Sequence, residues 1–235
     1  MTSPHNLGVH GSSQAALEAV GAEFINEGLF RAREKTIQVL EEIRAQLREG
    51  MTEGEARTLA LQIFKSHGVT KHWHQPGIRF GVGTRLNFND PLQPDYRLKA
   101  GDAYYLDLGP VWPDAELGLE YEGDYGDSFS LGENTGLANC AATARKIFTE
   151  ARAAWKEKRL TGAELYTFMR SRAKELGYEM IDGVEGHRVS EFPHQKHTKE
   201  RLSIIPFVPS PTIWVLELQL LDPSGEFGAF YEDLL

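Results

Sequence analysis

Two stretches of the sequence decide the fold: YYLDLGP, residues 104–110, and YEGDYGDSFSLG, residues 121–132. Both are short β-rich runs broken by glycine, which is typical of strands joined by tight turns. Each run carries an aspartate, Asp107 inside the first and Asp124 between glycines in the second. A buried ionised carboxylate is costly unless a cation compensates its charge. The two stretches therefore predict neighbouring strands that bring acids into a cation site.

Two further acids interrupt β-rich runs near the C-terminus, Glu217 in WVLELQLL and Glu232 in FGAFYEDLL. A histidine-rich stretch, DGVEGHRVSEFPHQKH at residues 182–197, precedes them. Carboxylate oxygens together with an imidazole nitrogen suit one or two divalent ions of the manganese, iron, cobalt or zinc kind. Any single acid could instead face water on the outer side of its strand, so it is the set that predicts a metal site.

The same order of elements occurs twice along the chain. Helical periodicity covers residues 14–50 and 135–158, and a second helix follows each of these segments. Both second helices end at a glycine after the same interval and open with a capping box, formed by Thr52 with Glu55 and by Thr161 with Glu164. The match could be a coincidence. Otherwise, two helices followed by strands, twice over, predict a pseudo-symmetric α/β domain with its site where the two sheet halves meet.

Length and composition limit the class of protein. At 235 residues the chain can bury a full core as one domain, which we place at residues 15–235 after a flexible segment at 1–14. The formal net charge of −9 argues against nucleic acid and anionic membranes as partners. Cys140 is the only cysteine, and the sequence shows neither a signal peptide nor an apolar run that could span a membrane. These features predict a soluble protein of the reducing cytoplasm.

The ordered series of acids and histidine resembles the metal ligands of the pita-bread metallopeptidases, the family that contains methionine aminopeptidase, aminopeptidase P and prolidase. LKAGDAYYLDLG and EGDYGDSFSLG resemble the strands that hold this family's two ligand aspartates. Asp124 rather than Asp127 is in register, because Phe129 and Gly132 then fall where the family has its phenylalanine and glycine. The resemblance implies the pita-bread fold, in which a pseudo-twofold pair of helix-helix-strand halves surrounds a curved antiparallel sheet.

The resemblance also implies a set of metal ligands. By analogy with the family, Asp124 and Glu232 would bridge two divalent ions, Asp107 would chelate one, and His187 with Glu217 would hold the other. The ions implied are manganese, cobalt, iron or zinc. Such a pair can lower the pKa of a shared water and stabilise an attacked carbonyl oxygen.

Two catalytic roles follow from the same resemblance. Glu217 would take the proton of the nucleophile, as its family counterpart is thought to do. GHRVSEFPH resembles the segment with the ligand histidine and a second histidine seven residues on, here His194. His194 would donate a hydrogen bond to the tetrahedral intermediate, and His197 would lie at the surface.

The sequence departs from the family pattern before the first ligand aspartate. The family has a substrate-binding histidine there, and its register falls near Asn89 and Asp90. In KHWHQPG, His74 or His72 could replace it, and we expect at most one of them to enter the site. We favour His74 as a catalytic residue, with a solvated hairpin histidine as the alternative.

Arg188 follows the expected ligand histidine at a position where the family tends to have glycine. Its guanidinium fits a carboxylate in two-point fashion, which predicts a substrate-binding role toward an acid group near the scissile bond. Alternatively, Arg188 turns away and pairs with Glu185 or Glu191, because adjacent strand residues face opposite sides.

Taken as a whole, the resemblance implies a dinuclear metal-dependent hydrolase of the aminopeptidase or Xaa-Pro dipeptidase type. Its substrate would be a peptide or amide bond in a small molecule, and a homodimer is a possible assembly. Two alternatives stay open: a different metal-dependent reaction on a small amine or amide, and a non-catalytic binding protein. The presence of all five expected ligands favours an enzyme over the binding protein.

Overall fold

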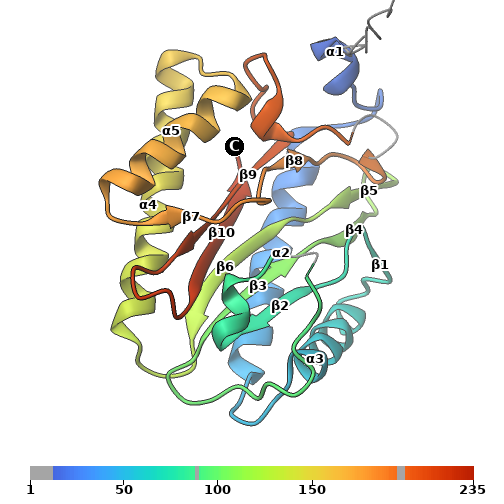
Figure 1. The fold of residues 1–235 in the computed structure, drawn as a ribbon. Coiled ribbons are helices and arrows are strands. Elements are labelled where there is room, and N and C mark those ends of the chain that lie inside the picture. The colour runs from blue at the N-terminus through green and yellow to red at the C-terminus, as the bar shows by residue number, and fades with distance from the viewer. Residues whose placement is uncertain (1–12, 88–89, 195–198) are drawn as a thin grey trace, which may run out of the picture.

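The computed structural model describes residues 13–87, 90–194 and 199–235, and Figure 1 shows how their helices and strands are arranged. The flexible segment expected at residues 1–14 lies outside the described residues, apart from its last two. None of the described helices is both long and apolar enough to cross a membrane.

The α-helices of the described chain are α1 (Gln14–Leu17), α2 (Asn26–Gln46), α3 (Glu53–Ser66), α4 (Thr135–Lys158) and α5 (Gly162–Glu175). The single helix predicted over residues 14–50 is wrong, because α1 and α2 are separate. At the end of α1, Glu18 accepts hydrogen bonds from the amide of Ser210 at 2.7 Å and the indole of Trp214 at 2.8 Å. These tertiary contacts outweigh the helical periodicity of the segment.

Both predicted capping boxes are confirmed. In α3 the Thr52 hydroxyl accepts from the Glu55 amide while the Glu55 carboxylate accepts from the Thr52 amide, and Thr161 with Glu164 do the same in α5. The helix pairs α2–α3 and α4–α5 each precede strands. The predicted pseudo-symmetric pair of helix-helix-strand halves is therefore present.

The main sheet has seven strands in the described chain, and all of its pairings are antiparallel. Its order is β2-β3-β6-β10-β9-β7, with β8 also paired to β9. The strands are β2 (Gly77–Phe80), β3 (Ala103–Leu108), β6 (Tyr125–Ser130), β7 (Glu179–Met180), β8 (His187–Arg188), β9 (Trp214–Leu221) and β10 (Gly228–Leu234). The two halves meet where β6 pairs with β10.

A smaller sheet stands beside the main one, in the order β1-β4-β5. Its strands are β1 (Lys71–His72), β4 (Pro110–Asp114) and β5 (Leu119–Glu122). The β4–β5 hairpin interrupts the chain between β3 and β6, so it separates Asp107 from Asp124 in sequence while the flanking strands remain paired. Two 3₁₀ turns complete the description, η1 (Gly81–Arg85) and η3 (Leu202–Ile204).

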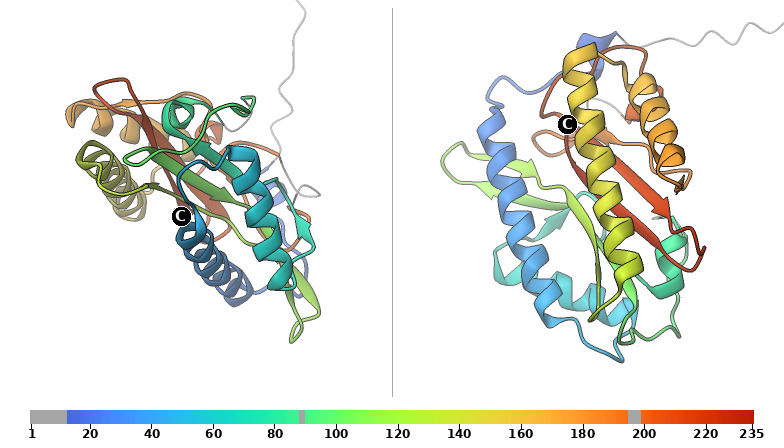
Figure 2. Two further views of the ribbon diagram at one scale, coloured as in Figure 1. Left: turned by 90° about the horizontal axis from the view of Figure 1, so that it is seen from below. Right: turned by 90° about the vertical axis from the view of Figure 1, so that its left-hand side faces the viewer.

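The helices bury one face of the sheet and leave the other for the site. Figure 2 shows α2 and α4 crossing the same face. Because strand side chains alternate, Leu106 and Leu108 of β3 join the helix-covered core, whereas Tyr105 joins a separate apolar cluster with Val184 and Phe230. Fully burying each core leucine contributes roughly 1.5–3 kcal/mol. This packing fixes which residues of each strand face the cleft.

Candidate metal centre

Three acids lie in one row across the main sheet. The register pairs Asp107 of β3 with Gly126 of β6, Gly126 with Glu232 of β10, and Glu232 with Glu217 of β9. Paired residues of antiparallel strands project their side chains to the same face. The row therefore brings carboxylates from both halves of the domain together on the face opposite the helices.

Glycines make room for two of these carboxylates. A Cβ at Gly126 would lie 2.7 Å from Oε1 of Glu232, and one at Gly77, which pairs with Asp107, would lie 2.8 Å from Oδ2 of that aspartate. Contacts this short do not occur with real side chains. Any other residue at these two positions would displace an acid of the row.

Asp124 and His187 join the row from its edge. Asp124 comes just before β6, and His187 lies on β8. Nε2 of His187 lies 3.1 Å from Oδ2 of Asp124, while Nδ1 of His187 donates to the carbonyl of Arg188 at 3.0 Å. The expected ligand histidine thus faces the expected bridging carboxylate.

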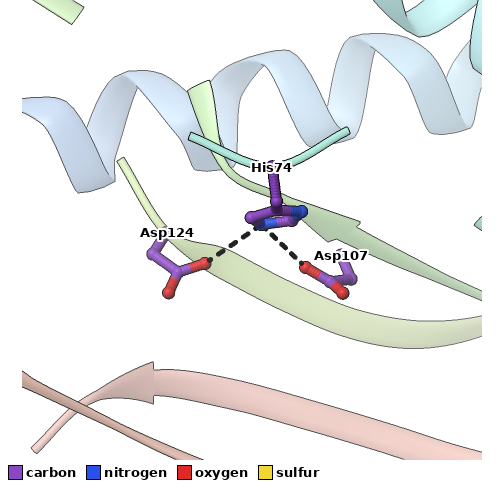
Figure 3. Close-up of side chains that lie close together, drawn as sticks. All are labelled: His74, Asp107 and Asp124. Atoms are coloured by element: carbon purple, nitrogen blue, oxygen red, sulfur yellow. Dashed lines mark ion pairs between the residues drawn. The ribbon is translucent and has the colours of Figure 1, made fainter. Parts of the chain in front are cut away.

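His74 approaches the same group from the other side. It lies in a bend between β1 and β2 and not on a strand. Figure 3 shows its ring above the carboxylates of Asp107 and Asp124. Nε2 lies 3.3 Å from Oδ1 of Asp107 and 4.0 Å from Oδ1 of Asp124. His72, by contrast, packs against the ring of Phe64.

Burial and the neighbouring charges shift the pKa values of all four acids. Burial, followed by repulsion from Asp124 and Asp107, raises the pKa of Glu232 well above its ordinary value. Burial also raises the pKa values of Asp107 and Glu217. Asp124 behaves differently, because its contacts with His187 and His74 outweigh its burial and lower its pKa.

The pKa values of His187 and His74 are both raised. Burial alone would lower the pKa of His187, but Asp124 and Glu217 raise it to about 10. For His74, Asp107 and Asp124 likewise outweigh burial and raise the pKa. Both histidines therefore lie in a strongly negative field that would attract a cation.

The donor set fits divalent cations. Among the described residues, both carboxylate oxygens of Asp124 and Oε1 of Glu232 are buried and have no well-formed hydrogen bond. The histidine nitrogens nearest to Asp124 lie 3.1 Å and 4.0 Å from its oxygens. Two groups offer ligand atoms close enough to share an ion, His74 with Asp107 and Asp124, and Asp124 with His187 and Glu232. Asp124 belongs to both groups. Buried acceptors without donors are costly, and bound ions would satisfy them.

Glu217 is held in place by the backbone. Its Oε1 accepts from the amides of Glu185 at 3.2 Å and Gly186 at 2.7 Å. These donors fix one carboxylate oxygen, and Glu217 also lines the cavity. Its carboxylate is thus held in a fixed position at the cavity.

His194 lies beside His187, with ring centroids 6.3 Å apart. Its Nδ1 lies 2.6 Å from Oε2 of Glu122. Glu122, almost fully buried, also accepts from the amides of Ser190 at 3.1 Å and His194 at 2.9 Å. Glu122 therefore orients both the ring and the backbone of His194.

A cavity of about 230 Å³ opens over the acid row. Its polar lining comprises His74, Asn87, Asp107, His187, Glu217, Gln219 and Glu232. Its apolar lining includes Trp73, Tyr105, Val184 and Phe230. The cavity therefore combines ligand groups on one side with an apolar wall on the other.

The structure corrects the substrate-binding role expected for Arg188. This side chain is buried away from the cavity, where it donates to the carbonyls of Ile213 at 3.0 Å and Ala19 at 3.1 Å and lies over the ring of Trp214. The cause is strand alternation: since His187 faces the cavity, its neighbour faces the opposite side. Arg188 is held by backbone carbonyls and not by a hydrogen bond to Glu185 or Glu191.

Other candidates fall outside the site. Asp127 accepts hydrogen bonds from Arg145 of α4 at 2.8 to 3.1 Å on the helix-covered face, so the structure brings Asp124 and not Asp127 to the acid row. His197 and Asn89 lie outside the described residues. Asp90 accepts from the amide of Asn87 at 2.7 Å, and Asn87 lines the cavity.

Sequence reasoning missed two residues of the site, Trp73 and Glu122. The Trp73 ring lies 4.2 Å from that of His74, 4.7 Å from that of His187 and 5.3 Å from that of His194. Its position between His72 and His74 in the sequence was a usable signal. Glu122 carried no such signal, because its partner His194 is distant in sequence.

Comparison with known proteins agrees with this geometry. Residues 27–235 match the model of metallopeptidase family M24. No curated protein sequence matches the chain.

Solved structures with the same fold include three peptidases. X-Pro aminopeptidase from Thermotoga maritima has a TM-score of 0.70 at 19% identity, with 88% of this chain and 56% of that chain covered. Prolidase from Pyrococcus furiosus has a TM-score of 0.66 at 21% identity, with 88% of this chain and 59% of that chain covered. Methionine aminopeptidase from Thermotoga maritima has a TM-score of 0.66 at 17% identity, with 92% of this chain and 93% of that chain covered. The expected pita-bread fold is confirmed, and the chain spans just over half the length of the first two proteins.

Proposed function

Because the chain belongs to metallopeptidase family M24, we propose that it is a metal-dependent hydrolase of the aminopeptidase or dipeptidase type, cleaving a peptide or amide bond in a small substrate. One observation carries the proposal: both oxygens of Asp124 and Oε1 of Glu232 are buried without a well-formed hydrogen bond, beside two histidines and two further acids. Bound cations would offset the cost of burying these oxygens.

Two divalent ions would suit this set, and Asp124 and Glu232 would be close to both of them. Asp107 would hold one, and His187 with Glu217 would hold the other. Four carboxylates carry four negative charges, which two dications balance. Manganese, cobalt, iron and zinc all suit oxygen and imidazole ligands, and manganese is our first choice because carboxylates predominate.

When bound, such ions supply a Lewis acid and lower the pKa of a water in the site. The protein groups then have separate tasks. Glu217, held through one oxygen by the Gly186 and Glu185 amides, takes the proton of the attacking water. His194 has its Nδ1 toward Glu122 and lies beside His187, outside the lining of the cavity; its other ring nitrogen would donate to the substrate oxygen that gains charge.

The cavity limits the substrate. Its volume of about 230 Å³ fits a dipeptide-sized molecule in part or whole. Tyr105, Val184 and Phe230 form a buried apolar cluster on its wall. We therefore expect an uncharged side chain next to the scissile bond and no arginine clamp for a substrate carboxylate, since Arg188 points away.

The setting of the enzyme belongs to the same proposal. A reducing cytoplasm suits a chain whose one cysteine, Cys140, is buried and unpaired. The residues 15–235 would act as one catalytic domain, with a homodimer as the assembly to test by light scattering. The acidic net charge of −9 makes nucleic acid an unfavourable partner.

The test is a substrate screen with metal-stripped and metal-loaded protein. Dipeptides, including Xaa-Pro, short peptides with N-terminal methionine, and small amides should be assayed with manganese, cobalt, iron and zinc. We expect hydrolysis of at least one peptide only in the loaded state. Turnover of small amides or amines without any peptide would favour the other metal-dependent reaction, and tight metal binding without turnover would favour a binding protein.

A further inference from the structure

His74 occupies a position that the backbone defines closely. The Trp73 amide donates to the carbonyl of Gly109 at 3.0 Å, and the Trp73 indole donates to the carbonyl of Gly123 at 3.3 Å. A Cβ at Gly109 would lie 2.1 Å from the His74 ring, so only glycine lets the imidazole approach at this point. The bend that carries His74 is thus tied to the backbone on both sides of the β4–β5 hairpin.

The ring nitrogens of His74 have different surroundings. Nδ1 donates to the carbonyl of Gln75 at 2.8 Å, which leaves the lone pair of the neutral ring on Nε2. Nε2 faces Oδ1 of Asp107 at 3.3 Å and Oδ1 of Asp124 at 4.0 Å, as Figure 3 shows. An outer hydrogen bond to a backbone carbonyl is the usual means of orienting a metal-bound histidine.

These separations suit a shared ion. Two ligand atoms, each about 2.1 Å from one ion, lie roughly 3.0–3.5 Å apart at tetrahedral or octahedral angles. The distance from His74 to Asp107 falls in this range. The distance to Asp124 exceeds it by about half an ångström, which a small inward movement of the ring would remove.

His187 provides an internal comparison. Its Nδ1 also donates to the carbonyl of the next residue, and its Nε2 faces the other oxygen of Asp124 at 3.1 Å. Asp124 therefore has one imidazole at each of its two carboxylate oxygens. The arrangement is the same on both sides, although only His187 belongs to the ligand series implied by the family resemblance.

We propose that His74 is a sixth metal ligand, completing with Asp107 and Asp124 the coordination of the ion on their side of the centre. Each of the two ions then carries one imidazole. A neutral imidazole adds no charge but shifts preference toward zinc, cobalt and iron and away from magnesium. This inference rests on the metal centre of the proposed function and goes beyond it in the composition of the centre.

The competing interpretation is that His74 is an imidazolium that pairs with the two aspartates or a histidine that contacts substrate. If the ring contacts only substrate, metal binding without substrate would not depend on it. Loss of an imidazolium would instead strengthen the attraction of the acids for cations. Ligation by His74 therefore predicts weaker metal binding when the ring is removed from the metal-stripped protein, whereas either alternative predicts unchanged or tighter binding.

The experiment titrates metal-stripped protein with Co²⁺ in the absence of any substrate, by calorimetry and by the visible spectrum of the bound ion. Wild type is compared with His74→Ala, with the nearly isosteric His74→Gln, and with His67→Gln, a surface histidine paired with Glu42. Thermal unfolding of each metal-stripped variant checks that the fold is retained. The His74→Ala titration is repeated with added imidazole, since His74 lines the cavity.

We expect one Co²⁺ per chain to bind at least 10- to 100-fold more weakly in both His74 variants, which is the loss seen for outer-shell partners alone. The spectrum should change, imidazole should restore affinity to His74→Ala, and His67→Gln should match wild type. Unchanged or tighter Co²⁺ binding in both His74 variants would overturn the assignment of His74 and leave the proposed function intact. If wild type itself bound no Co²⁺, the metal centre and the proposed function would fail together.

Discussion

The pair Glu53–Arg79 and the acids of the metal centre are both buried, but only the first set is satisfied within the protein. Glu53 accepts from the amides of Phe80 at 3.0 Å and Gln93 at 2.8 Å, and Arg79 lies 3.7 Å from it. Arg79 in turn donates to the carbonyls of Asn87 and Pro91, each at 2.9 Å. This network fixes the segment that places Asn87 at the cavity.

The acid row has no lysine or arginine paired with it among the described residues. Asp107, Glu217 and Glu232 come from three strands, and burial raises the pKa of each. Asp124 has the two histidines as counter-charges. The two sets differ in their hydrogen bonds: the Glu53–Arg79 pair has donors for its acceptors, whereas both oxygens of Asp124 and Oε1 of Glu232 have no well-formed hydrogen bond, which a bound cation would satisfy.

The largest effect should come from removing the carboxylate that both halves of the metal centre share. Asp124→Ala should abolish tight binding of metal and with it all turnover. Asp127→Ala is the matched control, because Asp127 lies close by on β6 with Arg145 as its partner. It should lose stability but retain metal. Metal analysis after dialysis checks both, and equal losses would show that the wrong aspartate has been assigned.

The Glu122–His194 pair should affect turnover without affecting metal content. His194→Ala should lower kcat roughly 10²- to 10⁴-fold, because the charge on the attacked oxygen loses a donor. Glu122→Gln should give a smaller loss, since it only misorients the imidazole. Single-turnover rates and metal stoichiometry of each variant provide the measurement. A metal-deficient His194 variant would place His194 among the ligands and remove this distinction.

Breaking the Glu53–Arg79 network should reduce the stability of the fold and leave the metal centre intact. Arg79→Met leaves Glu53 buried without its cation, which costs about 3–5 kcal/mol in the free energy of unfolding. Arg145→Met, at the partly exposed pair with Asp127, should cost less because water reaches the guanidinium. Urea unfolding of the metal-stripped proteins compares the two. Loss of metal in Arg79→Met at full folding would show that the two sets of charges are coupled.

The smallest effect should appear in the pH dependence of the metal-stripped protein. Because the folded-state pKa of Glu232 is raised by burial and by neighbouring acids, its ionisation disfavours the folded state. This penalty is absent below the pKa of the unfolded chain and grows as the pH rises toward the folded-state pKa. Stability should therefore fall from mildly acidic to neutral pH.

Glu232→Gln removes that ionisation, so the metal-stripped variant should lose less stability over the same pH range. Each kcal/mol of repulsion relieved raises Tm by roughly 2–4 °C for a chain of this size. Scanning calorimetry at several pH values compares the variant with wild type. Parallel pH profiles would mean that Glu232 is not repelled by its neighbours.

Much of the local structure could be read from the sequence because its causes are local. The boxes at Thr52 and Thr161 depend on residues three positions apart, and α4 and β9 occupy the segments predicted for them. The exception is residues 14–50, where Glu18 is drawn into contacts with residues far along the chain. Periodicity could not reveal those contacts.

The sequence by itself determined the types of the ligands and the order in which they occur, because an ionised acid inside an apolar strand is costly unless a cation neutralises it. Only the tertiary structure decided how they meet. It placed glycine opposite Asp107 and Glu232, turned Arg188 toward the carbonyls of Ile213 and Ala19, and brought His74 to Asp124. These outcomes depend on strand register and on packing between distant segments, which fix side-chain direction only once the sheet has formed.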